Sequence, residues 1–275
     1  NDANTYALIL WDHGGGIDGV CLDDSSTSDL ITMNELSQAM TTIDTRLGRN
    51  LDIIGFDACL MGMVDVGFQI RGTGNIMIGS EELIPGDGWP YDDILTDRTN
   101  NDQMTINDFA AIIVNEYIAS YNGGSQGNRQ ETTLSAYRIN DMVNQITPAI
   151  DNFALQLING LAQWRQQIII SRTNSEAYDS ELPNGITFAD SYRDIFDFAF
   201  EVNQRVTDVN IQNAAQNVMT AITNACIAEG HLTNRPDSHG LSIYWPMQAQ
   251  YDTAYNNIDF SINTNWDDFI ITIGV

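Results

Sequence analysis

Lysine is absent from this 275-residue chain, in which all 11 basic residues are arginine and 37 residues are acidic. The formal net charge at pH 7 is therefore −26. Because a surface this acidic repels phosphate backbones, the charge argues against a nucleic-acid partner. Cationic peptides, divalent cations and simple solubility remain as explanations of the acidity.

Cysteine is scarce as well. The three cysteines, Cys21, Cys59 and Cys226, cannot form a paired framework, and no CxxC spacing indicates a zinc or redox site. Such an odd, sparse set is typical of one working thiol accompanied by buried bystanders.

Long apolar runs are also missing. None approaches the roughly 18 residues that a transmembrane helix needs, so we expect no membrane span. The chain has no initiator Met and no signal peptide, and it opens at Asn1 shortly before an apolar strand. We therefore interpret it as a processed or excised piece of a longer product. Its hydrophobic fraction of 43% predicts a folded chain, large enough for one α/β domain with or without a subdomain.

The N-terminal residues predict a β-α-β unit. Residues 6–11 and 51–56 are short apolar runs, typical of strands that are buried on both faces. Between them, Thr32 and Glu35 have the spacing of a capping box, and apolar residues follow with helical spacing over 33–47. A strand, a helix and a strand in this order predict two parallel strands joined by a right-handed crossover.

Two reactive side chains follow these strands. Parallel strands end at the same edge of a sheet, where open α/β sheets bind ligands. His13 follows the first strand and Cys59 the second. Cysteine proteolysis needs a thiol, an imidazole and backbone N–H donors for the oxyanion, and the amides of Gly14 and Cys59 are natural donors. Taken singly, such a Cys is often a small buried hydrophobe and such a His a structural residue. Their joint placement favours a dyad.

The rest of the chain alternates between helical and strand patterns. Helices are predicted at 105–121, 140–170, 189–206 and 208–229. Strands are predicted at 75–79, 133–139 and 241–245. We place a soft boundary near residue 125. Residues 1–125 would form an α/β core with the dyad, and residues 126–275 a helix-rich part that returns a strand to the sheet, unless the two form one domain.

The motifs around the dyad resemble those of a known family. Residues 11–16 (WDHGGG) and 57–62 (DACLMG) resemble the two catalytic motifs of the clostripain family of cysteine peptidases, which are relatives of caspases, legumains and gingipains. The resemblance continues, in the family's order, through residues 80–89, 189–198 and 239–246.

This resemblance implies a caspase–haemoglobinase-like α/β fold, with a mostly parallel sheet flanked by helices. It implies His13 as general acid/base and Cys59 as nucleophile. It also implies an acidic S1 pocket, formed by Asp57 and Asp87, that selects Arg and then Lys in polypeptide substrates. A carboxylate near a substrate cation is chemically sensible, although each Asp could instead only cap a turn or lie in a loop. The expected location is secreted, cell-surface or periplasmic.

The chain departs from the family in two ways. Family members usually carry a further βα unit before the first strand, so we expect a separate N-terminal chain or propeptide, a different covering of the gap, or an incomplete sequence. Many relatives also cut themselves after a basic residue between the two motifs. From Gly14 to Thr45 no Arg or Lys occurs, and Arg46 and Arg49 are the only basic residues between the dyad members.

Other functions stay open at this point. A catalytically silent binding or structural module of an acidic extracellular protein is the main alternative. An acidic calcium-binding assembly domain is another, because Asp23–Asp24 and Asp92–Asp93 could hold a hard cation. We expect no cofactor or metal in the chemistry itself, and a structural calcium ion only as a lesser possibility than a solvated acidic face.

Overall fold

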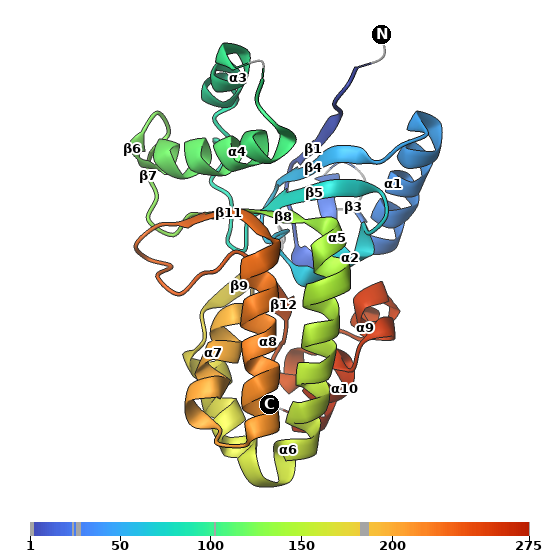
Figure 1. Ribbon diagram of the computed structural model, residues 1–275, viewed down its shortest axis with the longest axis vertical. Helices are drawn as coiled ribbons and strands as arrows, with labels where there is room; N and C mark the ends of the chain where they lie inside the picture. The colour runs from blue at the N-terminus through green and yellow to red at the C-terminus, as the bar shows by residue number, and fades with distance from the viewer. Residues whose placement is uncertain (1–2, 24, 26–28, 102, 182–186, 275) are drawn as a thin grey trace.

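A five-stranded sheet forms the upper part of the computed structural model, which describes residues 3–23, 25, 29–101, 103–181 and 187–274 (Figure 1). Its strand order is β1-β4-β5-β8-β11. The strands are β1 (Ala7–Trp11), β4 (Leu51–Asp57), β5 (Gly74–Gly79), β8 (Thr133–Arg138) and β11 (Cys226–His231).

The first three of these strands are parallel, as the β-α-β pattern predicts. β1 pairs with β4 and β4 with β5 in parallel, whereas β8 is antiparallel to both β5 and β11. Two helices separate β5 from β8, and they return the chain to the edge where β5 ends. There the hydroxyls of Ser80 and Thr133 lie 3.0 Å apart in a hydrogen bond. The sheet is therefore mixed.

The crossover helix α1 (Met33–Leu47) has the predicted ends. Thr32 and Glu35 form a complete capping box, and Gly48 ends the helix in a left-handed conformation with φ of 66°. Its buried residues Met33 and Leu36 pack into the core. The predicted helix and both of its flanking strands are thus confirmed.

Apolar side chains cover both faces of the sheet. On one face, Ile53 and Ile76 pack with Val114 of α4 (Ile106–Tyr121). On the other face, Ile54 and Met77 belong to a larger cluster that includes α1, α2 (Val64–Gln69) and much of the second half of the chain. The alternation of neighbouring residues between the two clusters is that of strands buried on both faces.

The second half is mainly helical, and three of its helices form a bundle below the sheet (Figure 1). These are α6 (Thr147–Asn174), α7 (Ile195–Arg205) and α8 (Val209–Ala225). A short helix α5 (Ile139–Asp141) and the π-helix η2 (Met142–Ile146) lead into α6.

Two predicted helices in this half are too long. The predicted helix 189–206 begins too early, because its first residues, 189–194, belong to strand β10 (Thr187–Asp194). Helix α7 begins only after Asp194, whose side chain accepts a hydrogen bond from the Asp197 N–H. The other predicted helix, 208–229, ends at Ala225, where β11 begins. Local helical spacing continues past both ends, but pairing with other strands takes precedence there.

The predicted late strand lies outside the main sheet. β12 (Ser242–Tyr244) pairs with β10, which also pairs with β9 (Ala177–Glu181), in a separate three-stranded sheet. The second half contributes β8 and β11 to the main sheet instead. The division near residue 125 stays a prediction.

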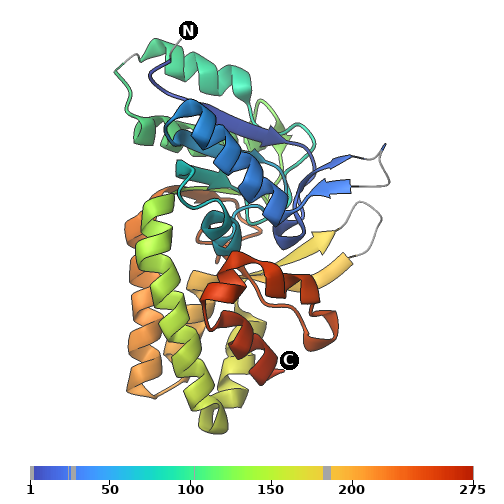
Figure 2. The same ribbon diagram turned by 90° about the vertical axis from the view of Figure 1, so that its right-hand side faces the viewer.

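The remaining elements are short. Figure 2 shows that the hairpin β2–β3 projects from the same side of the molecule as the hairpin β9–β10. The short elements are η1 (Gly16–Asp18), β2 (Val20–Asp23), β3 (Asp29–Ile31), α3 (Tyr91–Asn100), β6 (Asn122–Gly124), β7 (Gly127–Asn128), η3 (Gln248–Gln250), η4 (Thr253–Asn257), α9 (Asp259–Asn263) and α10 (Trp266–Ile273).

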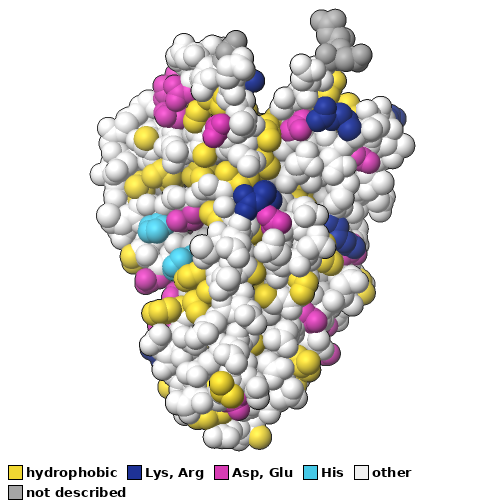
Figure 3. Space-filling model, in the orientation of Figure 1, with side chains coloured by type: hydrophobic (Ala, Val, Ile, Leu, Met, Phe, Trp, Pro, Cys, Tyr) yellow, Lys and Arg dark blue, Asp and Glu magenta, His cyan; other side chains and the backbone are white. Residues whose placement is uncertain are grey.

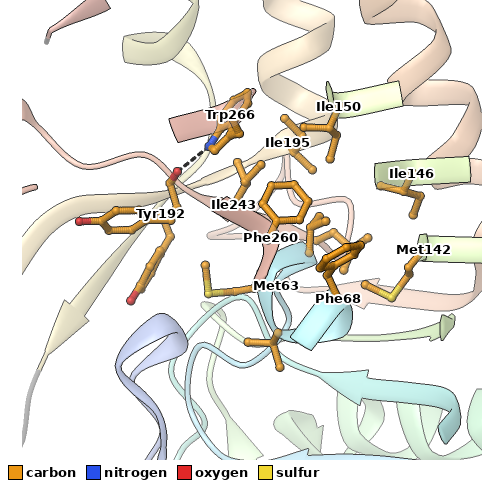
Figure 4. Close-up of a cluster of buried hydrophobic side chains, with 14 of the residues drawn as sticks. Met63, Phe68, Met142, Ile146, Ile150, Tyr192, Ile195, Ile243, Phe260 and Trp266 are labelled. Carbon is orange, nitrogen blue, oxygen red and sulfur yellow. Dashed lines mark hydrogen bonds between the residues drawn. The ribbon is translucent and has the colours of Figure 1, made fainter. Parts of the chain in front are cut away.

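One hydrophobic cluster connects the sheet to the second half. Close-packed side chains include Met63 and Phe68 near the sheet and Ile195, Phe260 and Trp266 from the C-terminal elements (Figure 4). The Trp266 indole N–H donates to the Tyr244 carbonyl oxygen at 2.7 Å. Residues 63–68, which follow β4, are therefore packed directly against the C-terminal elements.

Strand β1 is an edge strand. Within the described ranges it pairs only with β4, and the side chain of Trp11 at its end is 65% exposed. Hydrophobic side chains gather in a hollow between α3, α4 and β1 on the face shown in Figure 3.

Candidate active site

The register of β1 and β4 brings the two predicted dyad residues together. Trp11 lies opposite Asp57 at the carboxyl ends of the two strands. His13 and Cys59 each follow two residues later, so that the chain leaves both strands at the same place. Leu60, directly after Cys59, has a left-handed backbone with φ of 64°, a strained conformation of the kind that occurs at functional sites.

A cleft of about 220 Å³ lies at this edge of the sheet. Its walls include His13, Cys59 and Asp57, together with Trp11 and Asp12. The structure therefore places three of the predicted site residues around one cavity. The other wall comes from the loop after β5, through Ile84, Pro85, Gly86 and Gly88.

Gly14 packs directly against the backbone of Cys59. A Cβ atom at Gly14 would lie 2.2 Å from the Cys59 carbonyl oxygen, so only glycine fits there. Gly14 forms an isolated bridge with Val20, in which the Gly15 N–H donates to the Gly19 carbonyl oxygen and the Cys21 N–H donates to the His13 carbonyl oxygen. The Gly14 N–H is not used in these bonds and lies against Cys59.

The thiol of Cys59 is partly buried, and burial raises its pKa. Backbone N–H groups of Ile84, Gly14 and Cys59 lower the pKa, whereas the carboxylate of Glu82 raises it further. The Ile84 N–H lies 3.2 Å from the sulfur. A resting thiol with a raised pKa is protonated near neutral pH, so its attack requires a base.

Asp57 is 2% exposed, and its two carboxylate oxygens differ. Oδ2 accepts hydrogen bonds from the Trp89 N–H at 3.1 Å and the Tyr91 hydroxyl at 2.8 Å. Oδ1 is buried and has no hydrogen-bond partner among the described residues. Burial raises the pKa of this carboxyl, while the two donors lower it. A buried oxygen without a partner is suited to a cationic ligand.

Asp87 has a different environment. It is exposed and does not line the cleft, although its neighbours Gly86 and Gly88 do. Its backbone carbonyl accepts a hydrogen bond from the Gln126 side chain at 3.0 Å. The structure thus brings Asp57, but not Asp87, onto the wall beside His13 and Cys59.

The sequence did not reveal two supports of the site that come from the second half of the chain. The Tyr192 hydroxyl donates to the Gly15 carbonyl oxygen at 2.8 Å and so holds the loop that carries His13. Arg235 forms an ion pair with Glu82, whose backbone oxygen accepts from the Leu60 N–H at 3.3 Å. These contacts join residues that are far apart in the chain, so no local sequence pattern predicts them.

The other candidates lie outside the cleft. Cys21 and Cys226 are free thiols whose pKa burial raises. His239 stacks on Phe196 with ring centroids 4.1 Å apart, and its backbone N–H donates to Asp194.

Metal and membrane signals are few. Within the described ranges no three His, Cys, Asp or Glu side chains form a metal-binding group. Asp24 of the acidic pair Asp23–Asp24 lies outside the described residues, and calcium at Asp92–Asp93 stays a prediction. No helix in the described part of the chain is long and apolar enough to cross a membrane.

Comparison with known proteins identifies relatives. The sequence profile of the clostripain family matches residues 1–272. Clostripain of Hathewaya histolytica is 27% identical over 301 aligned residues, which cover 93% of this chain and 56% of that protein. The chain thus spans about half the length of this curated relative.

Solved structures show the same fold. A secreted C11 cysteine protease from Bacteroides thetaiotaomicron, in complex with an irreversible peptide inhibitor, matches with a TM-score of 0.64 at 17% identity, over 98% of this chain and 72% of that one. An inactive zymogen C11 protease from Parabacteroides distasonis matches with a TM-score of 0.64 at 19% identity, over 95% and 70%. The predicted caspase-like α/β fold is confirmed.

Proposed function

Because this chain belongs to the clostripain family, we propose that it is the catalytic part of a cysteine endopeptidase that cleaves polypeptides after Arg and, second, Lys. The observation that carries this proposal is the cleft shared by His13, Cys59 and Asp57. It combines a thiol, an imidazole and a buried carboxylate at the end of two parallel strands. A silent binding module would not require this combination.

The chemistry follows from the positions of these groups. The Cys59 thiol gives its proton to His13 and attacks the scissile carbonyl carbon. The N–H groups of Gly14 and Cys59 then stabilise the oxyanion. His13 donates the proton to the leaving amine, which leaves an acyl-enzyme, and water hydrolyses the thioester with His13 as base. These groups suffice for each proton transfer, so the proposed chemistry uses no cofactor.

Specificity in this proposal comes from Asp57, with Asp87 at the loop that forms the opposite wall. A substrate guanidinium or ammonium would satisfy the partnerless Asp57 Oδ1 through a charge-assisted hydrogen bond. An acidic substrate side chain would instead meet like charge. The strongly acidic composition would also attract cationic peptides.

We further propose that the protein acts outside the cell, at the cell surface or in the periplasm. One relative of the same fold is described as secreted, which supports an extracellular location. A separate N-terminal chain or propeptide remains a proposed partner, since β1 has an open edge within the described residues.

A thiol-reactive peptide that ends in arginine tests this function. We expect it to label Cys59, which peptide mapping by mass spectrometry distinguishes from the free thiols Cys21 and Cys226. The same probe with Asp in place of Arg is the matched control, and the His13→Ala variant should label slowly. Equal labelling by both probes would contradict the proposed preference for basic residues. An unlabelled Cys59 would contradict the peptidase proposal.

A further inference from the structure

The two oxygens of the Asp57 carboxylate are used unequally. Oδ2 accepts both available hydrogen bonds, from the Trp89 N–H and the Tyr91 hydroxyl. Oδ1 accepts none among the described residues, although it is buried. A carboxylate without these donors could turn about its Cβ–Cγ bond and exchange its oxygens. The pair of donors fixes which oxygen stays available.

We propose that Tyr91 is the positioning residue of the specificity pocket, whose hydroxyl holds Asp57 Oδ2 so that Oδ1 is presented to the substrate cation. This inference rests on the proposed peptidase function. Tyr91 lies outside the motifs on which the family resemblance rests. The two oxygens of the Asp57 carboxylate then have different roles.

The local structure supports this role for Tyr91. Tyr91 is the first residue of α3, and it follows Pro90, whose ring restricts the backbone of the preceding loop. Trp89 is 2% exposed, and its ring centroid lies 6.3 Å from that of Tyr91. Both donors to Oδ2 therefore come from one short segment, in which Trp89 is buried and Tyr91 is 39% exposed. The donor on Trp89 is backbone, so the Tyr91 hydroxyl is the donor that a substitution can remove.

The close approach of Gly88 limits the carboxylate further. A Cβ atom at Gly88 would lie 2.8 Å from Oδ2 and 3.1 Å from Oδ1, and Gly88 has a φ of 65°. The backbone of the loop thus lies directly beside both oxygens. Of the two, Oδ1 is the oxygen that has no hydrogen-bond partner among the described residues, so we expect a cation bound there to meet no competing donor.

A matched control is available in Tyr121, the last residue of α4, which bonds to the same loop. The Tyr121 hydroxyl donates to the Gly88 carbonyl oxygen at 2.9 Å, and the Gln126 side chain donates to the same oxygen at 3.1 Å. Tyr121→Phe removes one tyrosine hydroxyl that anchors this loop without touching Asp57. If Tyr91 served only to anchor the loop, the two Phe variants would behave alike.

The experiment compares wild type, Tyr91→Phe and Tyr121→Phe. Steady-state hydrolysis of peptide substrates with Arg or Lys at the cleavage site gives KM and kcat. Calorimetry with a simple alkylguanidine gives the affinity of the pocket without turnover. For Tyr91→Phe we expect KM and the alkylguanidine Kd to rise roughly 10- to 150-fold, the size expected when a charged group loses one hydrogen bond, with kcat within about twofold. Tyr121→Phe should stay near wild type.

Two results would overturn the inference: unchanged KM and Kd in Tyr91→Phe, or the same rise in Tyr121→Phe. Thermal unfolding of each variant establishes that the fold is retained. If the wild type binds the alkylguanidine but hydrolyses no peptide, the peptidase proposal fails, while the calorimetric comparison still decides the role of Tyr91. If the wild type does not bind the alkylguanidine, the pocket assignment fails and this inference with it.

Discussion

Arg235 forms an ion pair with Glu82, a residue that is 4% exposed and whose carboxylate raises the pKa of the Cys59 thiol. Replacing Arg235 by Gln would remove a cation that offsets this carboxylate. We expect the pKa of Cys59 to rise and its alkylation by iodoacetamide at pH 7 to slow several-fold, because the thiolate is the reactive form. The pH profile of alkylation, read at Cys59 by peptide mapping, measures the effect.

A second substitution separates this effect from a loss of structure. Glu82→Gln in the Arg235→Gln background removes the carboxylate itself and should restore the alkylation rate. Arg235 also pairs with Glu176 at 3.0 Å, so Glu176→Gln is the matched control and should leave Cys59 unchanged. A double variant that is as slow as Arg235→Gln alone would contradict the electrostatic explanation.

Replacing Gly14 by Ala should impair catalysis strongly. The new Cβ would clash with the Cys59 carbonyl oxygen. It would thereby displace the Gly14 N–H from the proposed oxyanion site. Loss of one oxyanion donor lowers kcat by roughly 100- to 1000-fold in comparable sites, and we expect a loss of that order. Gly15→Ala is the control, because its nearest contact is the Asp18 side chain at 3.3 Å. Equal losses in both variants, measured as kcat on one substrate, would contradict this role for Gly14.

The two acidic candidates should contribute unequally. Asp57→Asn would leave a substrate cation without its buried charge partner, which costs about 2–4 kcal/mol in kcat/KM for Arg and Lys substrates. Asp87 is exposed and away from the cleft wall, so we expect a smaller loss for Asp87→Asn. Both variants should keep the wild-type unfolding temperature within a few degrees. If neither changed the preference for Arg, the pocket would lie elsewhere.

Asp65 should make the protein less stable as the pH rises. It is fully buried, and burial raises its pKa from 3.8 to about 6, although Tyr255 and Tyr244 donate hydrogen bonds to it. Between these two values the folded state keeps a proton that the unfolded state has released. The free energy of unfolding therefore falls across this window, by roughly 3 kcal/mol from this group.

Chemical denaturation at several pH values between about 4 and 7 measures this slope. Asp65→Asn should lose the part of the slope that Asp65 contributes, whereas replacing the exposed Asp29 by Asn should not. Asp18 and Asp197 also have raised pKa values, of about 6 and about 7, so a residual slope of the same sign is expected. An Asp65→Asn slope equal to that of wild type would rule out this role.

Local patterns in the sequence were sufficient to predict that His13 and Cys59 lie close together at the centre of the site. A capping box, two apolar strands and the residues that follow them predict the β-α-β unit, and its register brings His13 and Cys59 to one cleft. The resemblance to the clostripain family also implied Asp57, the first residue of the motif at 57–62, and Asp57 lines the same cleft. These features depend on residues close together in the chain.

The incorrect and missing predictions concern features that depend on residues far apart in the chain. The predicted helices included residues 189–194 and 226–229, but these residues belong to β10 and β11 because partner strands from elsewhere in the chain pair with them. Two hydrogen bonds likewise join segments that only the folded chain brings together: that of Tyr91 to Asp57 and that of Tyr192 to Gly15. Tertiary packing determines these strands and hydrogen bonds, and a short stretch of sequence does not contain the information to predict them.

The support of the His13 loop by Tyr192 has a consequence for biosynthesis. A ribosome extends the chain from its N-terminus, so His13 and Cys59 leave the exit tunnel well before Tyr192 and Arg235 are translated. Domains fold as their residues emerge, but this cleft needs both late residues before its loops are held in place. The nascent chain would therefore carry Cys59 in an unassembled cleft until Arg235 has been translated, and under the proposed function it would be inactive during that time.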